Sequence, residues 1–488
     1  MGSMLLWGVS MRSSTGHAKV PLDYDNPDGE SAAIALIRLP ANISPDSEDY
    51  LGPILSNPGG PGGSGVESVL KQGKLFQSIF GAQFDIVSFD PRGVQRSTPR
   101  AVFYKSLTER IFTHRAATEL NHSAETVGSF WASNKIMGSL ALQRGKEYLP
   151  HINTDHSARD MLKIVEAYGE EKLQYWGFSY GSVLGYTFAS MFPDKVGRLI
   201  IDGVPDPEDY YGTRWLTGLK DIDITLKWFF TSCKEAGPES CAFYEDSVEA
   251  IEAKLNGIYD SLIKAPIPVE TDVSHGLVDY TLVHYTVLTK LYTPFESWRV
   301  LAEGLAGLAE GNGTAFYNLV ATPMFECNCD PAVNDLAPVI ESLNVYYCND
   351  GDVVPPDVEF ARAHYKESTD FSSFGSIWAS FRIACAGWSS ELRKDYFRGP
   401  IGATNTSFPL LIIGNVAAQA MRSYFVNGTL PAEGTVCPMD GSPFDGPEAA
   451  STTISRRAAG SEEEEQMYKA LQKLARTGAP KGPSLLWA

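Results

Sequence analysis

The segment Gly177-Phe178-Ser179-Tyr180-Gly181 leaves this chain few ways to fold locally. Residues 173–176 predict a strand before it, and the helical spacing that follows predicts a helix to about residue 191. Glycines on both sides of the serine allow a sharp turn that lifts the hydroxyl above the end of the strand. A strand, Gly-x-Ser-x-Gly and a helix in this order predict that Ser179 is a nucleophile.

A second constraint is the run Asn57-Pro58-Gly59-Gly60-Pro61-Gly62-Gly63-Ser64-Gly65, in which five of nine residues are glycine. Such a loop lets backbone N–H groups approach one oxygen of a ligand. It lacks both the Lys-Ser/Thr of a phosphate-binding P-loop and the GxGxxG spacing of a dinucleotide site. We therefore predict an oxyanion hole, with one N–H from Gly60 and the other from Tyr180.

The order of apolar runs predicts an α/β fold with a mostly parallel, doubly wound sheet. Strands are expected at residues 32–39, 52–56, 84–89, 173–176, 198–201 and 408–414. After the fifth strand the pattern changes to amphipathic helices rich in Trp, Tyr and Leu, which is typical of a helical cap. We predict four segments: the N-terminal part of the core at 18–204, the cap at 205–370, the shortened C-terminal part of the core at 371–440, and a loosely ordered tail at 441–488.

The charge of the chain restricts its partners. Its formal net charge is −19 and its pI is near 4.9, so nucleic acids and anionic membranes would be repelled. No stretch approaches the roughly 18 apolar residues that a membrane span needs. A small molecule or a short peptide is the expected partner, and no feature indicates an oligomeric state.

Cysteines and glycosylation sequons bear on the compartment. Five Asn-x-Ser/Thr sequons and seven cysteines suggest a secreted glycoprotein, but the opening apolar run lacks the basic residues of a signal peptide, so the location stays open. Spacing allows the pairs Cys233–Cys241 and Cys348–Cys385. Without a CxxC pair or a His-rich segment, the sequence predicts no metal site and no nicotinamide or flavin cofactor. The sequons are at Asn42, Asn121, Asn312, Asn405 and Asn427.

Taken together, the runs 57–65, 84–93 and 177–181 resemble the secreted tripeptidyl aminopeptidase-like branch of the α/β hydrolases, which is related to proline iminopeptidases. The resemblance extends over most of residues 18–440, and proteins of this kind are common in fungi and actinobacteria. It implies the α/β-hydrolase fold and exopeptidase or related ester and amide hydrolysis. It also implies a serine nucleophile, an acid after a late strand and a histidine nearer the C-terminus.

The C-terminal half departs from that pattern. Asn415 runs directly into a segment that resembles the family's closing helix, and no histidine follows His364. His284 and His364 are the candidate replacement bases, although a lone histidine on a helix is more often structural. Asp202 is the candidate acid at the end of its strand, or else a turn residue beside Gly203.

Three explanations of the missing acid and base stay open at this stage. The chain is a catalytically silent or non-hydrolytic homologue, such as a binding or tailoring protein of secondary metabolism; or it is an enzyme that relies on its cavity and oxyanion hole; or its gene prediction omits an exon. A serine without a base retains only what the oxyanion hole and binding supply, about 10³ to 10⁴ over water.

Overall fold

The computed structural model describes residues 14–116, 119–120, 123–272, 274–320, 339–402, 405–414, 418–436, 441–445, 465–467, 469–470 and 473–474. Cys327, Cys329, Cys437, Asn121, His122 and the segment 415–417 lie outside these residues, as does most of the predicted tail.

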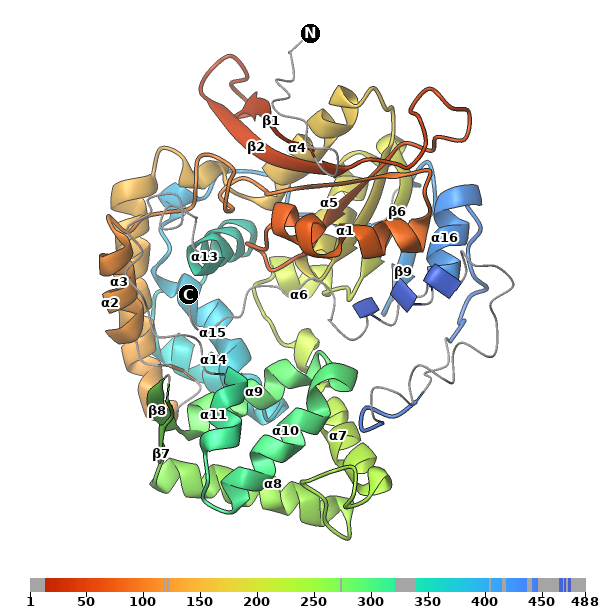
Figure 1. Ribbon diagram of the computed structural model, residues 1–488. Helices are drawn as coiled ribbons and strands as arrows, with labels where there is room; N and C mark the ends of the chain where they lie inside the picture. The colour runs from red at the N-terminus through yellow and green to blue at the C-terminus, as the bar shows by residue number, and fades with distance from the viewer. Residues whose placement is uncertain are drawn as a thin grey trace.

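A seven-stranded sheet forms the centre of the molecule, in the order β1-β2-β4-β3-β5-β6-β9 (Figure 1). Strands β3, β4, β5, β6 and β9 are parallel to their neighbours in that group, whereas β1 pairs with β2, and β2 with β4, in antiparallel fashion. The predicted mostly parallel sheet is thereby confirmed. The strands are β1 (Ser14–Pro21), β2 (Ser31–Leu39), β3 (Pro53–Asn57), β4 (Asp85–Phe89), β5 (Leu173–Phe178), β6 (Val196–Asp202) and β9 (Leu411–Ile413).

Helices cover both faces of this sheet. Successive strand residues point to opposite faces, so the apolar residues of each strand are buried against helices on both sides. Leu55, Val87 and Tyr175 pack in one buried cluster with helices α4 (Thr154–Ala167) and α5 (Tyr180–Met191). The neighbours of these strand residues, Ile54, Ile86 and Trp176, pack on the other face with α1 (Gly65–Phe80) and α16 (Ala418–Asn427). The carboxyl ends of β3 and β5 therefore emerge between two helical layers.

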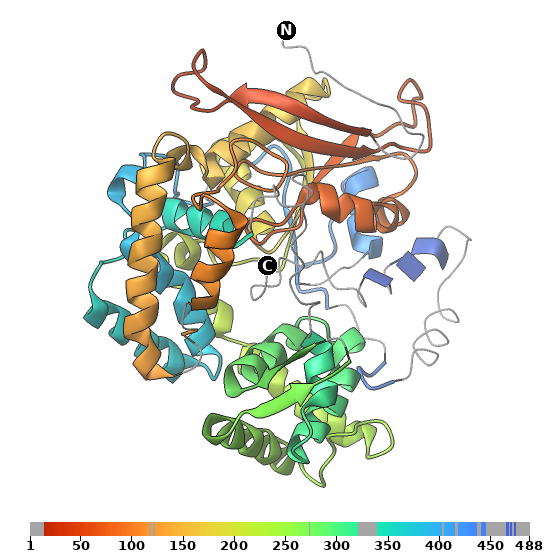
Figure 2. The same ribbon diagram turned by 60° about the vertical axis from the view of Figure 1, so that its left-hand side comes forward.

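Between β6 and β9 the chain is mostly helical. One group of elements surrounds its own buried cluster and stands apart from the sheet at the bottom of Figures 1 and 2. This group contains α7 (Ile222–Ala236), α8 (Val248–Lys264), β7 (Ile267–Glu270), β8 (His275–Val278), α9 (Tyr280–Leu291), α10 (Pro294–Ala309) and α11 (Thr314–Val320).

The other helices lie closer to the core. Helix α13 packs against the cluster on the α4 and α5 face of the sheet, and α3, from the N-terminal part of the chain, packs against α14 and α15. The boundaries at residues 204, 370 and 440 stay predictions. The helices outside the separate group are α2 (Leu107–Ala116), α3 (Val127–Gly145), α6 (Pro207–Tyr211), α13 (Val339–Asp350), α14 (Val358–Phe371) and α15 (Gly375–Ala384). Single 3-10 turns lie at Ala124–Thr126, Leu149–His151, Pro193–Lys195, Thr217–Leu219, Cys385–Gly387 and Ser390–Leu392.

Two disulfides cross-link the mostly helical part of the chain between β6 and β9. Cys233 and Cys241 have Cα atoms 5.3 Å apart, and Cys348 and Cys385 have Cα atoms 5.2 Å apart. Both predicted pairs are therefore confirmed. Among the described helices, none combines the length and the apolar character that a membrane crossing requires.

A fully buried ion pair joins the end of β4 to α4. The guanidinium of Arg92 donates to both oxygens of Asp160, at 2.8 Å from Nε and 2.6 Å from Nη2. Its remaining N–H groups reach the carbonyls of Pro21, Leu22 and His151. Neither charged side chain has any solvent exposure, so the pair depends on all these contacts for its stability.

We predict that Asp160→Asn destabilises the fold by about 3–5 kcal/mol, because the Arg92 charge stays buried without its counter-charge. The control is Glu166→Gln on the same helix, whose ion pair with Lys163 is half exposed and should matter little. Urea unfolding of both variants checks this. Equal, small losses for the two would contradict the account of Arg92.

Candidate active site

Ser179 occupies the turn between β5 and α5, as the sequence predicts. Its backbone has φ +53° and ψ −118°, a conformation that side-chain-bearing residues rarely adopt. Its N–H donates to the carbonyl of Asp202 at 2.8 Å, and the side chain is exposed. The hydroxyl is thus presented to solvent at the carboxyl end of the sheet.

Ser182, one turn into α5, fixes this elbow to β6. Its hydroxyl donates to the carbonyl of Asp202 at 2.8 Å and accepts from the Asp202 N–H at 3.0 Å. Its own N–H donates to the carbonyl of Ser179 at 2.8 Å. The conformation of Ser179 is therefore determined from two sides.

The glycine-rich loop lies directly against the elbow. A Cβ on Gly59 would stand 2.4 Å from the carbonyl oxygen of Phe178 and 3.1 Å from the nitrogen of Tyr180, so only glycine fits there. The loop is held by a hydrogen bond of 2.9 Å from the Gly59 N–H to the side chain of Asn57. The loop that carries Gly60, the predicted oxyanion residue, thus packs against Tyr180 through Gly59.

The N–H groups of Gly60 and Tyr180, the predicted oxyanion donors, have no acceptor within the described residues. Tyr180 is the first residue of α5, so its N–H has no acceptor within the helix. The N–H of Gly60 has no hydrogen-bond acceptor among the described residues. The start of the helix adds a partial positive charge.

A buried network that the sequence did not predict holds the side chain of Tyr180. Its hydroxyl lies 2.7 Å from that of Thr154, which donates to Asp350 at 2.6 Å. Asp350, at the end of α13, also accepts from the Tyr210 hydroxyl at 2.7 Å, and burial raises the pKa of its carboxyl. No local motif marks Asp350, because its partners lie 140 and 196 residues away.

Asp202 lies beside the elbow through its backbone. Its side chain is buried next to the indole of Trp176, and burial raises the pKa of the carboxyl to about 7. In the part of the chain that the structure describes, no histidine contacts it. Both interpretations of Asp202, as triad acid and as turn residue, stay open.

The two candidate bases lie elsewhere. The ring of His284 stacks between those of Tyr280 and Phe374, with centroids 5.1 and 4.8 Å away, inside the separate helical group. His364 is buried on α14, where its Nδ1 is 3.6 Å from Glu367. Burial lowers the pKa of each imidazole to about 4, and neither contacts Ser179 among the described residues.

The late strand on which the family's acid is expected is β9. It pairs with β6 at the edge of the sheet, with Ile413 opposite Asp202. After Gly414, the next described residue is Ala418 at the start of α16. Asn415, on which the predicted departure from the family rests, lies outside the described residues.

Comparisons with known proteins agree with this fold. Residues 52–230 match the family described as the alpha/beta hydrolase fold. Serine protease Hip1 of Mycobacterium tuberculosis is 33% identical over 305 residues, which are 61% of this chain and 56% of that protein. Tripeptidyl aminopeptidase of Streptomyces lividans is 34% identical over 207 residues, 41% of this chain and 37% of its own length.

Other matches are more distant. Carboxylesterase B of Mycobacterium tuberculosis is 27% identical over 396 residues, which cover 80% of this chain and 71% of that protein. An epoxide hydrolase from an endophytic Streptomyces is 13% identical over 85% of both chains, with a TM-score of 0.29, too low to bear on the argument.

The chain spans about half the length of the first of these relatives. The sheet, the elbow and the family match nevertheless agree on the core. The chain has the α/β-hydrolase fold, and its homologues include a serine protease and a tripeptidyl aminopeptidase.

Proposed function

We propose that the chain slowly hydrolyses short peptides or small esters and amides, with Ser179 as nucleophile and the N–H groups of Gly60 and Tyr180 as oxyanion donors. The observation that carries this proposal is the exposed Ser179 at φ +53° with the Gly59 backbone packed against it. The names of the serine protease and the aminopeptidase support a peptide substrate, and that of the carboxylesterase supports an ester.

The proposed chemistry is acyl transfer. The Ser179 oxygen attacks the carbonyl carbon, and the negative charge that develops on the carbonyl oxygen is stabilised by the two N–H groups. The hydroxyl proton must leave in the same step. Since no imidazole contacts Ser179 in the described part of the chain, we propose that water accepts the proton and that acylation is slow. The bond from the carbonyl carbon to the amine or alcohol then breaks, the leaving group takes a proton from water, and a second water hydrolyses the acyl-Ser179 ester.

We further propose that the helices between β6 and β9 act as the cap over this site. Tyr347 of α13 donates from its hydroxyl to the carbonyl of Gly60 at 3.2 Å, so this part of the chain reaches the oxyanion loop itself. The ring of Tyr210, on α6, lies 6.2 Å from that of Tyr180. Side chains of the cap would thus border the substrate on the side opposite the sheet.

The second candidate is a catalytically silent homologue, such as a binding or tailoring protein. The positions of His284 and His364 favour it, since both imidazoles are packed away from Ser179.

We also propose passage through an oxidising compartment, which the two disulfides support. The exposed sequon residues Asn42, Asn312 and Asn427 would then be open to glycosylation.

We predict that the purified chain cleaves an activated p-nitrophenyl ester slowly and that Ser179→Ala abolishes this activity. A tripeptide p-nitroanilide should turn over no more than about 10³ to 10⁴ above the uncatalysed rate, since only the oxyanion hole and binding assist. Steady-state assays measure the turnover of the ester and of the tripeptide, and labelling by a fluorophosphonate probe measures the reactivity of Ser179. Ser261→Ala, an exposed position on α8, is the matched control.

Two results would decide against this proposal. Ordinary peptidase rates that need Ser179 but are insensitive to changes of His284 and His364 would show that a base exists after all. Absence of both Ser179-dependent ester cleavage and probe labelling would establish the silent homologue.

We predict that Gly59→Ala lowers the Ser179-dependent ester rate by about 10²- to 10³-fold, the usual effect of losing one oxyanion donor. The added Cβ would displace the elbow or the loop. Gly169→Ala is the control, because Gly169 has a similar φ of +80° but no atom within 4 Å of the added carbon. The two variants share the backbone strain, so only the contact at the site distinguishes them. Equal rates in both would rule out the Gly59 loop as part of the oxyanion hole.

A further inference from the structure

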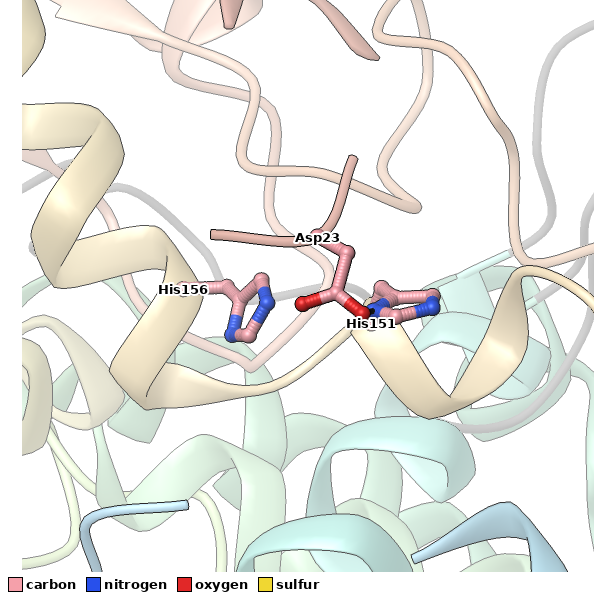
Figure 3. Close-up of side chains that lie close together, drawn as sticks. All are labelled: Asp23, His151 and His156. Atoms are coloured by element: carbon pink, nitrogen blue, oxygen red, sulfur yellow. Dashed lines mark ion pairs between the residues drawn. The ribbon is translucent and has the colours of Figure 1, made fainter. Parts of the chain in front are cut away.

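Away from the elbow, three side chains that are far apart in the sequence converge. Asp23 follows β1, His151 ends a 3-10 turn, and His156 lies in the first turns of α4. One ligand atom from each lies within 4.8 Å of the other two. Figure 3 shows the carboxylate of Asp23 between the two imidazoles.

His156 is the unusual member of this cluster. It is 1% exposed, and neither ring nitrogen has a hydrogen-bond partner. The nearest carboxylate, Asp155, is 3.5 Å from Nδ1 and already accepts from Arg159 at 2.7 Å and from the Phe397 N–H at 3.1 Å. A buried imidazole without a partner is costly unless it meets a ligand.

The cluster already attracts a cation. The ammonium of Lys394 lies 3.0 Å from Asp23 Oδ2 and 3.3 Å from His151 Nε2, while the side chain is 43% exposed. An exposed lysine of this kind is free to leave when a divalent ion arrives.

The surroundings hold the ligand-bearing segments in place. One nitrogen of Arg92 donates to the carbonyls of both Leu22 and His151, at 2.8 and 3.0 Å, so a buried guanidinium fixes the backbone beside Asp23 and His151. The Tyr396 hydroxyl lies 3.1 Å from His151 Nδ1 and orients that ring. Such outer contacts set the orientation of metal ligands in proteins.

We propose that Asp23, His151 and His156 bind one divalent transition-metal ion of the Zn²⁺ class. Two imidazole nitrogens and one carboxylate oxygen suit Zn²⁺ and leave a fourth position for water. Ligand bonds of about 2.1 Å at tetrahedral angles place ligand atoms about 3.4 Å apart, so the side chains close inward on binding.

The bound ion would clamp the turn after β1 to the start of α4. Thr154, in the same first turn as His156, contacts the hydroxyl of Tyr180, whose backbone N–H is the proposed oxyanion donor. The role of the ion is therefore structural. Sequence reasoning that looks for CxxC pairs or His-rich segments misses this site, because Asp23 is 128 residues from His151.

The test is zinc binding by the untagged full-length protein, with its remaining thiols alkylated in every sample. Calorimetric titration with zinc chloride should give one ion per chain, and the melting temperature should rise with zinc concentration. Magnesium chloride should have no such effect, since Mg²⁺ prefers an all-oxygen site.

Variants identify the ligands. Asp23→Asn and His156→Ala should each weaken zinc binding by at least the roughly 10- to 100-fold that outer-shell partners cost. Lys394→Met should strengthen it by removing the competing ammonium, and His275→Ala, an exposed histidine on β8, should leave it unchanged. Asp23→Asn keeps the test valid if the His156 variant unfolds. Failure of the wild type to bind zinc, or zinc binding by both ligand variants with the affinity of the wild type, would overturn the proposal.

Discussion

The buried guanidinium of Arg92 organises one end of the molecule. All its N–H groups have acceptors, which come from the end of β1, the turn before α4, and α4 itself. A charge in such a place is tolerated only when its partners are fixed, so the three segments must meet in one arrangement. The same requirement brings Asp23 and His151 together, and a stability constraint thereby creates the candidate metal site.

A second constraint connects the sheet to the elbow. Asp202 ends β6, and its backbone accepts from Ser179 and exchanges two hydrogen bonds with Ser182. Register between β5 and β6 therefore determines the height of Ser179 above the sheet. The network of Tyr180, Thr154 and Asp350 then fixes the residue after Ser179 from the side of α4 and α13.

Local patterns explain which features the sequence predicted. The elbow and the glycine loop were found because their chemistry is contained in short segments, and the strand expected at 84–89 is observed at Asp85–Phe89 because all five of its residues are buried. Strand β1 was missed, since Ser14–Pro21 is an edge strand that mixes polar residues, glycine and proline. The strand expected at 408–414 is only Leu411–Ile413. Asp350 and the Asp23 cluster depend on contacts across more than 100 residues, which no periodicity reveals.

The backbone conformation of Ser179 supports a chemical role for its side chain. Holding a non-glycine residue at an unfavourable φ costs about 1–3 kcal/mol and persists only where the surroundings enforce it. A turn with a purely structural role is satisfied by glycine, which adopts positive φ at no steric cost. Ser179 instead keeps a side chain at φ +53°, exposed to solvent, beside a helix start and the Gly59 backbone. Because the hydroxyl is the one group that this costly choice adds, the elbow favours a nucleophile over a silent turn even where no imidazole contacts it.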